Sequence, residues 1–166
     1  MKIINWKFLR VALGMSCALL ATATTAAESQ TEKSDSAKPA YDAELATKLG
    51  ADDYGMHRYV MALLKAGPNR DRSAEAAAEL QRAHMANIQR LAEEGVLVLA
   101  GPFMDGGELR GIYVFDVDSV EEARKLTELD PAVKAGSLVM ELHPWYGSAA
   151  IKTINDLHSR IAKQAP

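Results

Sequence analysis

Cysteine is almost absent from this sequence, in which Cys17 is the single one among 166 residues. Cys17 lies in an apolar N-terminal segment that is expected to be cleaved off as a leader. The mature chain is therefore expected to contain no disulfide and no thiolate for nucleophilic or metal chemistry. The preceding residues Gly14 to Ser16 lack the aliphatic residue that a lipid-attachment site needs three positions upstream. A lipoprotein is therefore not expected.

Sequence motifs for cofactors are also missing. His57, His143 and His158 are scattered and form no HxH or HxxxH pair, so a histidine metal site is not expected. The chain has no GxGxxG after a predicted strand, no phosphate-binding P-loop and no GxSxG. These absences argue against nucleotide-binding proteins and serine hydrolases, and no cofactor is expected.

Positive charge is scarcer than negative charge, with 19 Lys and Arg against 22 Asp and Glu and a net charge of −3. Cleavage of the leader would remove Lys2, Lys7 and Arg10, which takes the net charge from −3 to −6. A mildly acidic chain with scattered cations is a poor partner for nucleic acid or for anionic lipid.

The N-terminus lacks an apolar run long enough to cross a membrane, since Val11 to Leu20 is too short. A basic start, this short run and the small residues at 21–23 and 25–27 predict a secretory signal peptide over residues 1–27. The mature protein is then expected to be periplasmic or secreted, without a membrane attachment. Residues 28–40 are polar and free of aromatic side chains, which is typical of a disordered linker.

Hydrophobic periodicity predicts one α+β domain. Apolar residues alternate in four expected strands, and a helical stripe follows the first and third of these strands. The order strand, helix, strand, strand, helix, strand is typical of the ferredoxin-like split βαβ arrangement, a four-stranded antiparallel sheet with both helices on one face. The expected strands are 56–66, 96–100, 111–117 and 138–145; the expected helices are 41–49 in an N-terminal extension (41–55), 73–94, 119–129 with a break at Asp130-Pro131, and a C-terminal helix within 149–166.

The sheet face without helices would carry large apolar side chains, those of Tyr59 or Val60 and their neighbours. Such a face is too apolar to remain in water. The simplest cover is a second copy of the chain, so the pattern predicts a homodimer.

His84 is the most informative functional residue. It lies in the apolar stripe of its helix, between Leu80 and Ile88, so its ring points toward the core. A titratable ring in that position is either hydrogen-bonded there for packing alone or used there in chemistry. Arg82, two residues earlier, is expected on another side of the helix as a solvated charge.

Asp130 is the natural partner of His84. As an Asp before Pro it is also a good N-cap for a helical turn, and one carboxylate can serve both purposes. Gly101 and Pro102 end a strand with little side-chain bulk, where they either terminate the strand or admit a ligand. Tyr59 is expected to help wall such a pocket.

Several separated segments together resemble the YciI-like (YCII-related) family over roughly residues 54–148. These segments are Arg82 to Met85, Gly95 to Phe103, Glu121 to Ala123, Asp130 to Gly136 and Pro144-Trp145. The resemblance implies a ferredoxin-like domain over residues 56–148 that assembles as a dimeric α/β barrel. It also implies a His–Asp pair at His84 and Asp130. The signal peptide, the N-terminal extension and the C-terminal helix depart from the family pattern.

Within the resembling family a few members are lyases on small cyclic or chlorinated aromatic compounds, and distant ones are isomerases. The resemblance thus implies a small-molecule pocket in which His84 and Asp130 act as a general acid–base pair for elimination or isomerisation. The alternative is a non-catalytic ligand-binding or structural homodimer in which the two residues form a satisfied polar pair. An open pocket beside the pair favours the first possibility, and a sealed pair favours the second.

Overall fold

The structure is a computed structural model that describes residues 39–164. The predicted signal peptide (1–27), most of the predicted linker (28–38) and residues 165–166 lie outside the described residues. The elements in chain order are α1 (Ala43–Leu49), β1 (Met56–Ala66), α2 (Ala74–Glu93), β2 (Leu97–Pro102), β3 (Leu109–Phe115), α3 (Val120–Glu128), α4 (Pro131–Lys134), β4 (Leu138–Ser148), the 3-10 helix η1 (Ala149–Thr153) and α5 (Ile154–Ile161).

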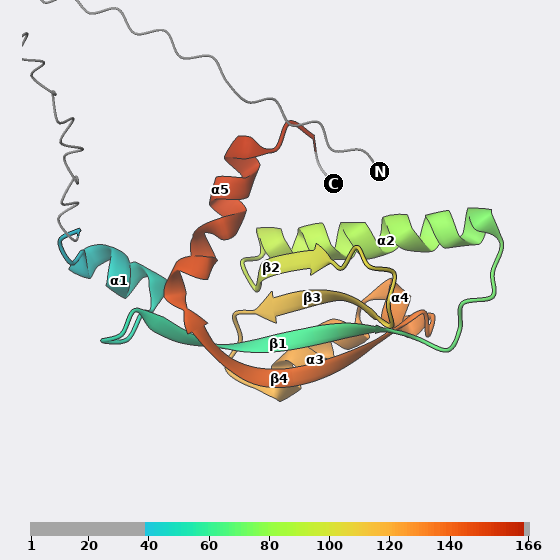
Figure 1. Ribbon diagram of the computed structural model, residues 1–166, viewed down its shortest axis with the longest axis horizontal. Coiled ribbons are helices and arrows are strands. Elements are labelled where there is room, and N and C mark those ends of the chain that lie inside the picture. Colours follow the sequence, from blue (N-terminus) through green and yellow to red (C-terminus); the bar gives the residue numbers. More distant parts are fainter. Residues whose placement is uncertain (1–38, 165–166) are drawn as a thin grey trace, which may run out of the picture. The chain divides into compact units, whose positions relative to one another are not determined.

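The four strands form one sheet in the order β2-β3-β1-β4, and every neighbouring pair is antiparallel. In Figure 1, α2 runs alongside the β2 edge of this sheet, and α5 follows η1 after the end of β4, near the start of β2. The predicted ferredoxin-like α+β fold is confirmed. The crossover from β1 through α2 to β2 skips one strand, and β3 fills that place.

The main core lies between the sheet and the helices. Val60, Ala62 and Leu64 alternate along β1 and pack in one buried cluster with Leu91 of α2 and Phe115 of β3. The intervening β1 residues face the other side, as strand alternation requires. The apolar stripe of α2 therefore presents its central residues, His84 among them, to the sheet.

Side-chain caps set the helix starts at the predicted residues. Ser73 Oγ accepts from Ala76 N at 3.3 Å, and Ser119 Oγ accepts from Glu122 N at 3.2 Å. Because the first amides of a helix have no partner inside it, such a cap decides where the helix begins. Gly95 follows the end of α2 with φ 75°, a left-handed conformation that glycine adopts without strain.

Several boundaries differ from the sequence-based prediction. β2 and β3 span Leu97–Pro102 and Leu109–Phe115, where strands at 96–100 and 111–117 were expected. β4 passes through Pro144 and continues to Ser148, beyond the expected end at residue 145. This is possible because β4 is an edge strand, where a residue without an amide hydrogen costs no ladder bond. The predicted single C-terminal helix begins instead as η1, which Ser148 caps by accepting from Ala150 N at 3.3 Å.

An ionic cluster joins the segments that flank the core domain. The His57 ring lies 2.9 Å from Gly50 O, after α1, and 2.8 Å from Asp116 Oδ1, at the end of β3. Lys152 of η1 binds the other Asp116 oxygen at 2.7 Å. The segment after α1 thus attaches to the sheet through His57, and η1 attaches through Asp116, which also contacts His57.

Between residues 39 and 164, no helix combines the length and the apolar character that a membrane crossing requires.

Candidate active site

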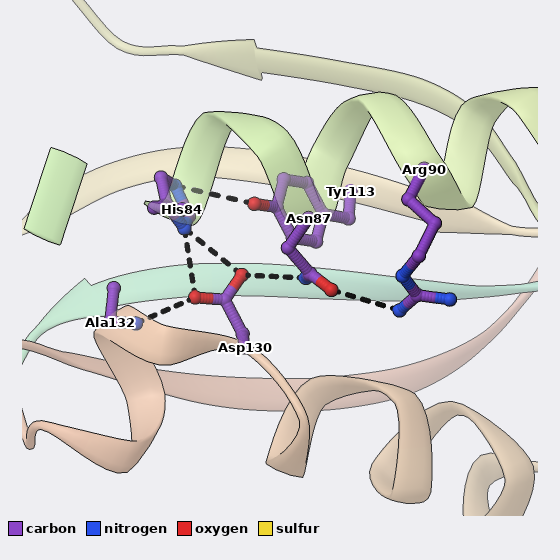
Figure 2. A network of polar contacts seen from close by, with 6 residues as sticks. All are labelled: His84, Asn87, Arg90, Tyr113, Asp130 and Ala132. Atoms are coloured by element: carbon purple, nitrogen blue, oxygen red, sulfur yellow. Dashed lines mark hydrogen bonds and ion pairs between the residues drawn. The ribbon is translucent and has the colours of Figure 1, made fainter. Parts of the chain in front are cut away.

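His84 and Asp130 meet, as the sequence predicted. Nδ1 of His84 lies 2.9 Å from both carboxylate oxygens of Asp130, across a separation of 46 residues (Figure 2). Both residues are buried, with exposed fractions of 8% for His84 and 1% for Asp130. A hydrogen bond to a carboxylate in such buried surroundings is electrostatically stronger than the same bond in water.

Asp130 is held by the break between α3 and α4. It is the N-cap of α4, and its Oδ1 accepts from the buried amide of Ala132 at 2.8 Å. Pro131 follows at the first helical position, where a missing amide hydrogen costs nothing. The expected double role is confirmed, since the same carboxylate caps α4 and accepts from His84.

A second donor from α2 completes the environment of the carboxylate. Asn87 Nδ2 donates to Asp130 Oδ2 at 3.3 Å, and Arg90 Nη2 donates to Asn87 Oδ1 at 2.9 Å (Figure 2). Residues 84, 87 and 90 are spaced so that they share one face of α2. Three donors therefore converge on Asp130, which is the pattern that suits the ionised carboxylate.

The other ring nitrogen of His84 faces β3. Its Nε2 lies 3.3 Å from the Tyr113 hydroxyl, and the two rings stack with 6.3 Å between their centroids. Burial, with the nearby Asp130 charge as a smaller cause, raises the pKa of the Tyr113 phenol far above its usual value, so this hydroxyl stays protonated. Since Asp130 only accepts, His84 carries its proton on Nδ1 and leaves Nε2 as the basic nitrogen.

The His84 ring lines a cavity of about 1230 Å³, bounded by α2, the strands β2 and β3, and α5. Tyr113, Gly101 and Pro102 line the same cavity, whereas Asp130 lies behind the histidine. The arrangement thus places a basic nitrogen and a hydroxyl donor beside the cavity, with an acid that orients the ring from the opposite side. This is a geometry suited to moving a proton.

The sequence comparisons give the family of this chain. A model of the YCII-related domain matches residues 59–146, more than half of the 166-residue chain. The chain belongs to the YCII-related domain family. The uncharacterized protein YjpA of Bacillus subtilis (strain 168) is 37% identical over 62 residues, which cover 37% of this chain and 71% of that protein.

A comparison of folds matches part of this chain with a solved structure. It is the 5-chloro-2-hydroxyhydroquinone dehydrochlorinase of Burkholderia phenoliruptrix AC1100 in complex with 2,5-dihydroxybenzoquinone. The match has a TM-score of 0.40 and 19% sequence identity, and it covers 52% of this chain and 92% of that one.

The expected place of Tyr59 in the pocket wall is wrong. Tyr59 lies in a separate buried cluster with Val98 and Val114, and it is not among the residues that line the His84 cavity. Its neighbour Val60 faces the helices, so strand alternation turns Tyr59 to the opposite face of the sheet. There its hydroxyl donates to Ser148 O at 3.1 Å, and burial raises its pKa to about 12.

Several residues of this YCII-related site were not predicted from the sequence. Asn87 was open to prediction, because it follows His84 by three positions on the same helical face. Tyr113 could be predicted as a site residue only from the pairing of β3 with β2, which places it opposite Ala100. Arg82 is exposed as expected, yet it also contributes to the cavity lining. Across residues 39–164, no cluster of His, Cys, Asp and Glu is arranged to hold a metal ion.

Proposed function

We propose that this YCII-related protein binds a small cyclic compound in the cavity beside His84 and transfers a proton on it, in an elimination or an isomerisation. The observation that carries the proposal is the buried His84–Asp130 contact at 2.9 Å with the ring on the cavity wall. The carboxylate holds the proton-bearing Nδ1, so Nε2 is left free of a proton and faces Tyr113.

In the proposed reaction, Nε2 of His84 removes a proton from carbon and becomes part of an imidazolium. The negative charge of Asp130 stabilises that cation. The electron pair left on the substrate then either expels a leaving group, in an elimination, or moves to a new position that is reprotonated, in an isomerisation. The Tyr113 hydroxyl is placed to hydrogen-bond a substrate oxygen on which negative charge develops.

Solvent deuterium exchange tests this proposal before the substrate is known. A panel of small lactones, cyclic ketones and hydroxylated aromatic compounds is incubated in deuterium oxide with the protein, and NMR follows loss of C–H signals. Wild type is expected to exchange at least one compound, and His84→Ala to lower that rate by about 10²–10⁴-fold. His143→Ala, at an exposed histidine paired with Glu141, is the matched control and should leave the rate unchanged. Equal rates in wild type and His84→Ala would contradict the proposal.

The second candidate function is ligand binding without catalysis. It is favoured by the observation that both ring nitrogens of His84 already have partners, Asp130 and Tyr113. The discriminating measurement is a thermal-shift screen of a metabolite pool. A compound that stabilises wild type, yet shows no deuterium exchange, would support a binding protein over an enzyme.

We also propose that the protein acts as a homodimer through the sheet face opposite α2. Ile151 of η1 packs at one end of that face. Further along it, Met61 and Leu63 are only half-buried and Val139 of β4 is 48% exposed. Light scattering after size exclusion should give about twice the chain mass, because association buries this apolar surface. A monomer at micromolar concentration would contradict the dimer.

Export remains our proposal for localisation, on the strength of the leader-like residues 1–27. The intact mass of the protein recovered outside the cytoplasm should correspond to a chain that lacks at least residues 1–23, with cleavage expected after residue 27. A product that retains residue 1 would contradict it.

A further inference from the structure

The cavity beside His84 has a charge of one sign. Arginines from three parts of the chain line it: Arg70 and Arg72 before α2, Arg82 on α2 and Arg110 on β3. No Asp or Glu is among the lining residues, although the chain has 22 of them against 19 Lys and Arg. Within residues 39–164, none of these four arginines forms an ion pair. The cavity thus concentrates positive potential in an acidic protein.

Arg110 has the most unusual environment of the four. Its Nη1 donates to Gly106 O at 3.4 Å. Its Nε is buried and has no hydrogen-bond partner within the described part of the chain. A buried donor without a partner costs free energy, so a ligand oxygen that reached this nitrogen would be bound favourably.

A β-bulge determines where this side chain lies. Leu64 of β1 pairs with Gly111, and the next residue, Lys65, pairs with Leu109, so Arg110 is an extra residue in β3. A bulge interrupts the alternation of a strand and redirects a side chain. The neighbouring Gly111 is required there, because a Cβ would lie 2.6 Å from Gly101 O of β2. Through this irregularity Arg110 shares one cavity with Tyr113, three residues further along β3.

We propose that the ligand of this cavity carries a carboxylate and that Arg110 binds it. The inference rests on the proposed function, since it names the substrate class of the same site. With Nη1 bonded to Gly106, the edge formed by Nε and Nη2 is left for the ligand. The two N–H groups of that edge match the two oxygens of a carboxylate.

The rest of the cavity limits what accompanies the carboxylate. Aliphatic side chains, including Leu80, Ile88, Leu97 and Leu138, make up much of the lining. They suit an apolar ring rather than a polyphosphate or a sugar. A carboxylate held at Arg110 would orient such a ring in the cavity that His84 lines. The positive potential of the arginines would also favour the negative charge that builds up when His84 removes a proton.

The test compares ligands of similar size, one with a carboxylate and one with a neutral amide in its place. Benzoate and benzamide are titrated into the purified full chain by NMR, with phenyl phosphate as a third probe. Benzoate is expected to bind at least about tenfold more tightly than benzamide, the contribution of a charge-assisted hydrogen bond. Arg110→Gln should remove this preference without changing the affinity for benzamide, and Arg110→Lys should restore part of it. The control Arg124→Gln, at an exposed arginine 3.7 Å from Glu121, should leave the preference intact.

Equal affinities of wild type for benzoate and benzamide, or no binding of benzoate at millimolar concentration, would overturn the inference. So would an unchanged preference in Arg110→Gln, or tighter binding of phenyl phosphate than of benzoate. The unchanged benzamide affinity shows that Arg110→Gln is folded. The outcome is separable from that of the proposed function. If only the proposed proton transfer is wrong, benzoate still binds wild type more tightly than Arg110→Gln, but no compound exchanges deuterium. If only the carboxylate inference is wrong, neutral compounds still exchange deuterium at a rate that depends on His84.

Discussion

Asp130→Asn is expected to slow proton exchange by about 10²–10⁴-fold, nearly as much as His84→Ala. Asn keeps the shape of Asp130 and an oxygen that can still accept from His84 and from the Ala132 amide, each bonded to Oδ1 in the wild type. It lacks the negative charge, however, and cannot stabilise the imidazolium that forms when His84 takes a proton. The measurement is the rate of deuterium incorporation into a compound that the wild type exchanges.

The double variant tests whether Asp130 acts through His84. If His84 and Asp130 act as a unit, Asp130→Asn combined with His84→Ala should be no slower than His84→Ala alone. Multiplication of the two single effects would mean that Asp130 acts independently of the histidine. Long-range NMR of the imidazole should in addition find the proton of wild-type His84 on Nδ1.

Asp130→Ala is expected to have the largest effect on stability, a loss of about 2–5 kcal/mol in the free energy of unfolding. The carboxylate is 1% exposed and accepts from His84, Asn87 and the Ala132 amide. Its removal leaves buried donors without an acceptor and removes the cap of α4. Urea unfolding followed by circular dichroism measures the change.

Asp42→Ala is the matched control for this variant. Asp42 also caps a helix, by accepting from Leu45 N at 2.9 Å, but it lies at the surface and has no buried partner. Its removal should lower the unfolding midpoint much less than Asp130→Ala does. Similar losses in the two variants would show that Asp130 stabilises the fold only as a helix cap.

Local signals in the sequence were sufficient for most of the elements. The bounds of β1 agree with the predicted strand, because alternation of apolar residues is a property of the segment itself. Ser73 and Ser119 mark helix starts for a similar reason, since a cap bonds to an amide only a few residues away. The end of β4 was predicted too early, because whether a strand continues past a proline such as Pro144 depends on which neighbours that strand has.

The residues of the candidate site likewise include some that local sequence patterns predict and some that depend on contacts between distant segments. The sequence alone determined that His84 faces the core, that Asp130 caps a helical turn beside a proline, and that helices cover one face of a four-stranded sheet. From these, the meeting of the two residues follows. Only the tertiary structure decided that Tyr59 lies on the opposite face, that Tyr113 reaches His84, and that a bulge brings Arg110 into the cavity. Periodicity specifies how a side chain is oriented within its own element, whereas strand register and bulges arise from pairing between distant segments.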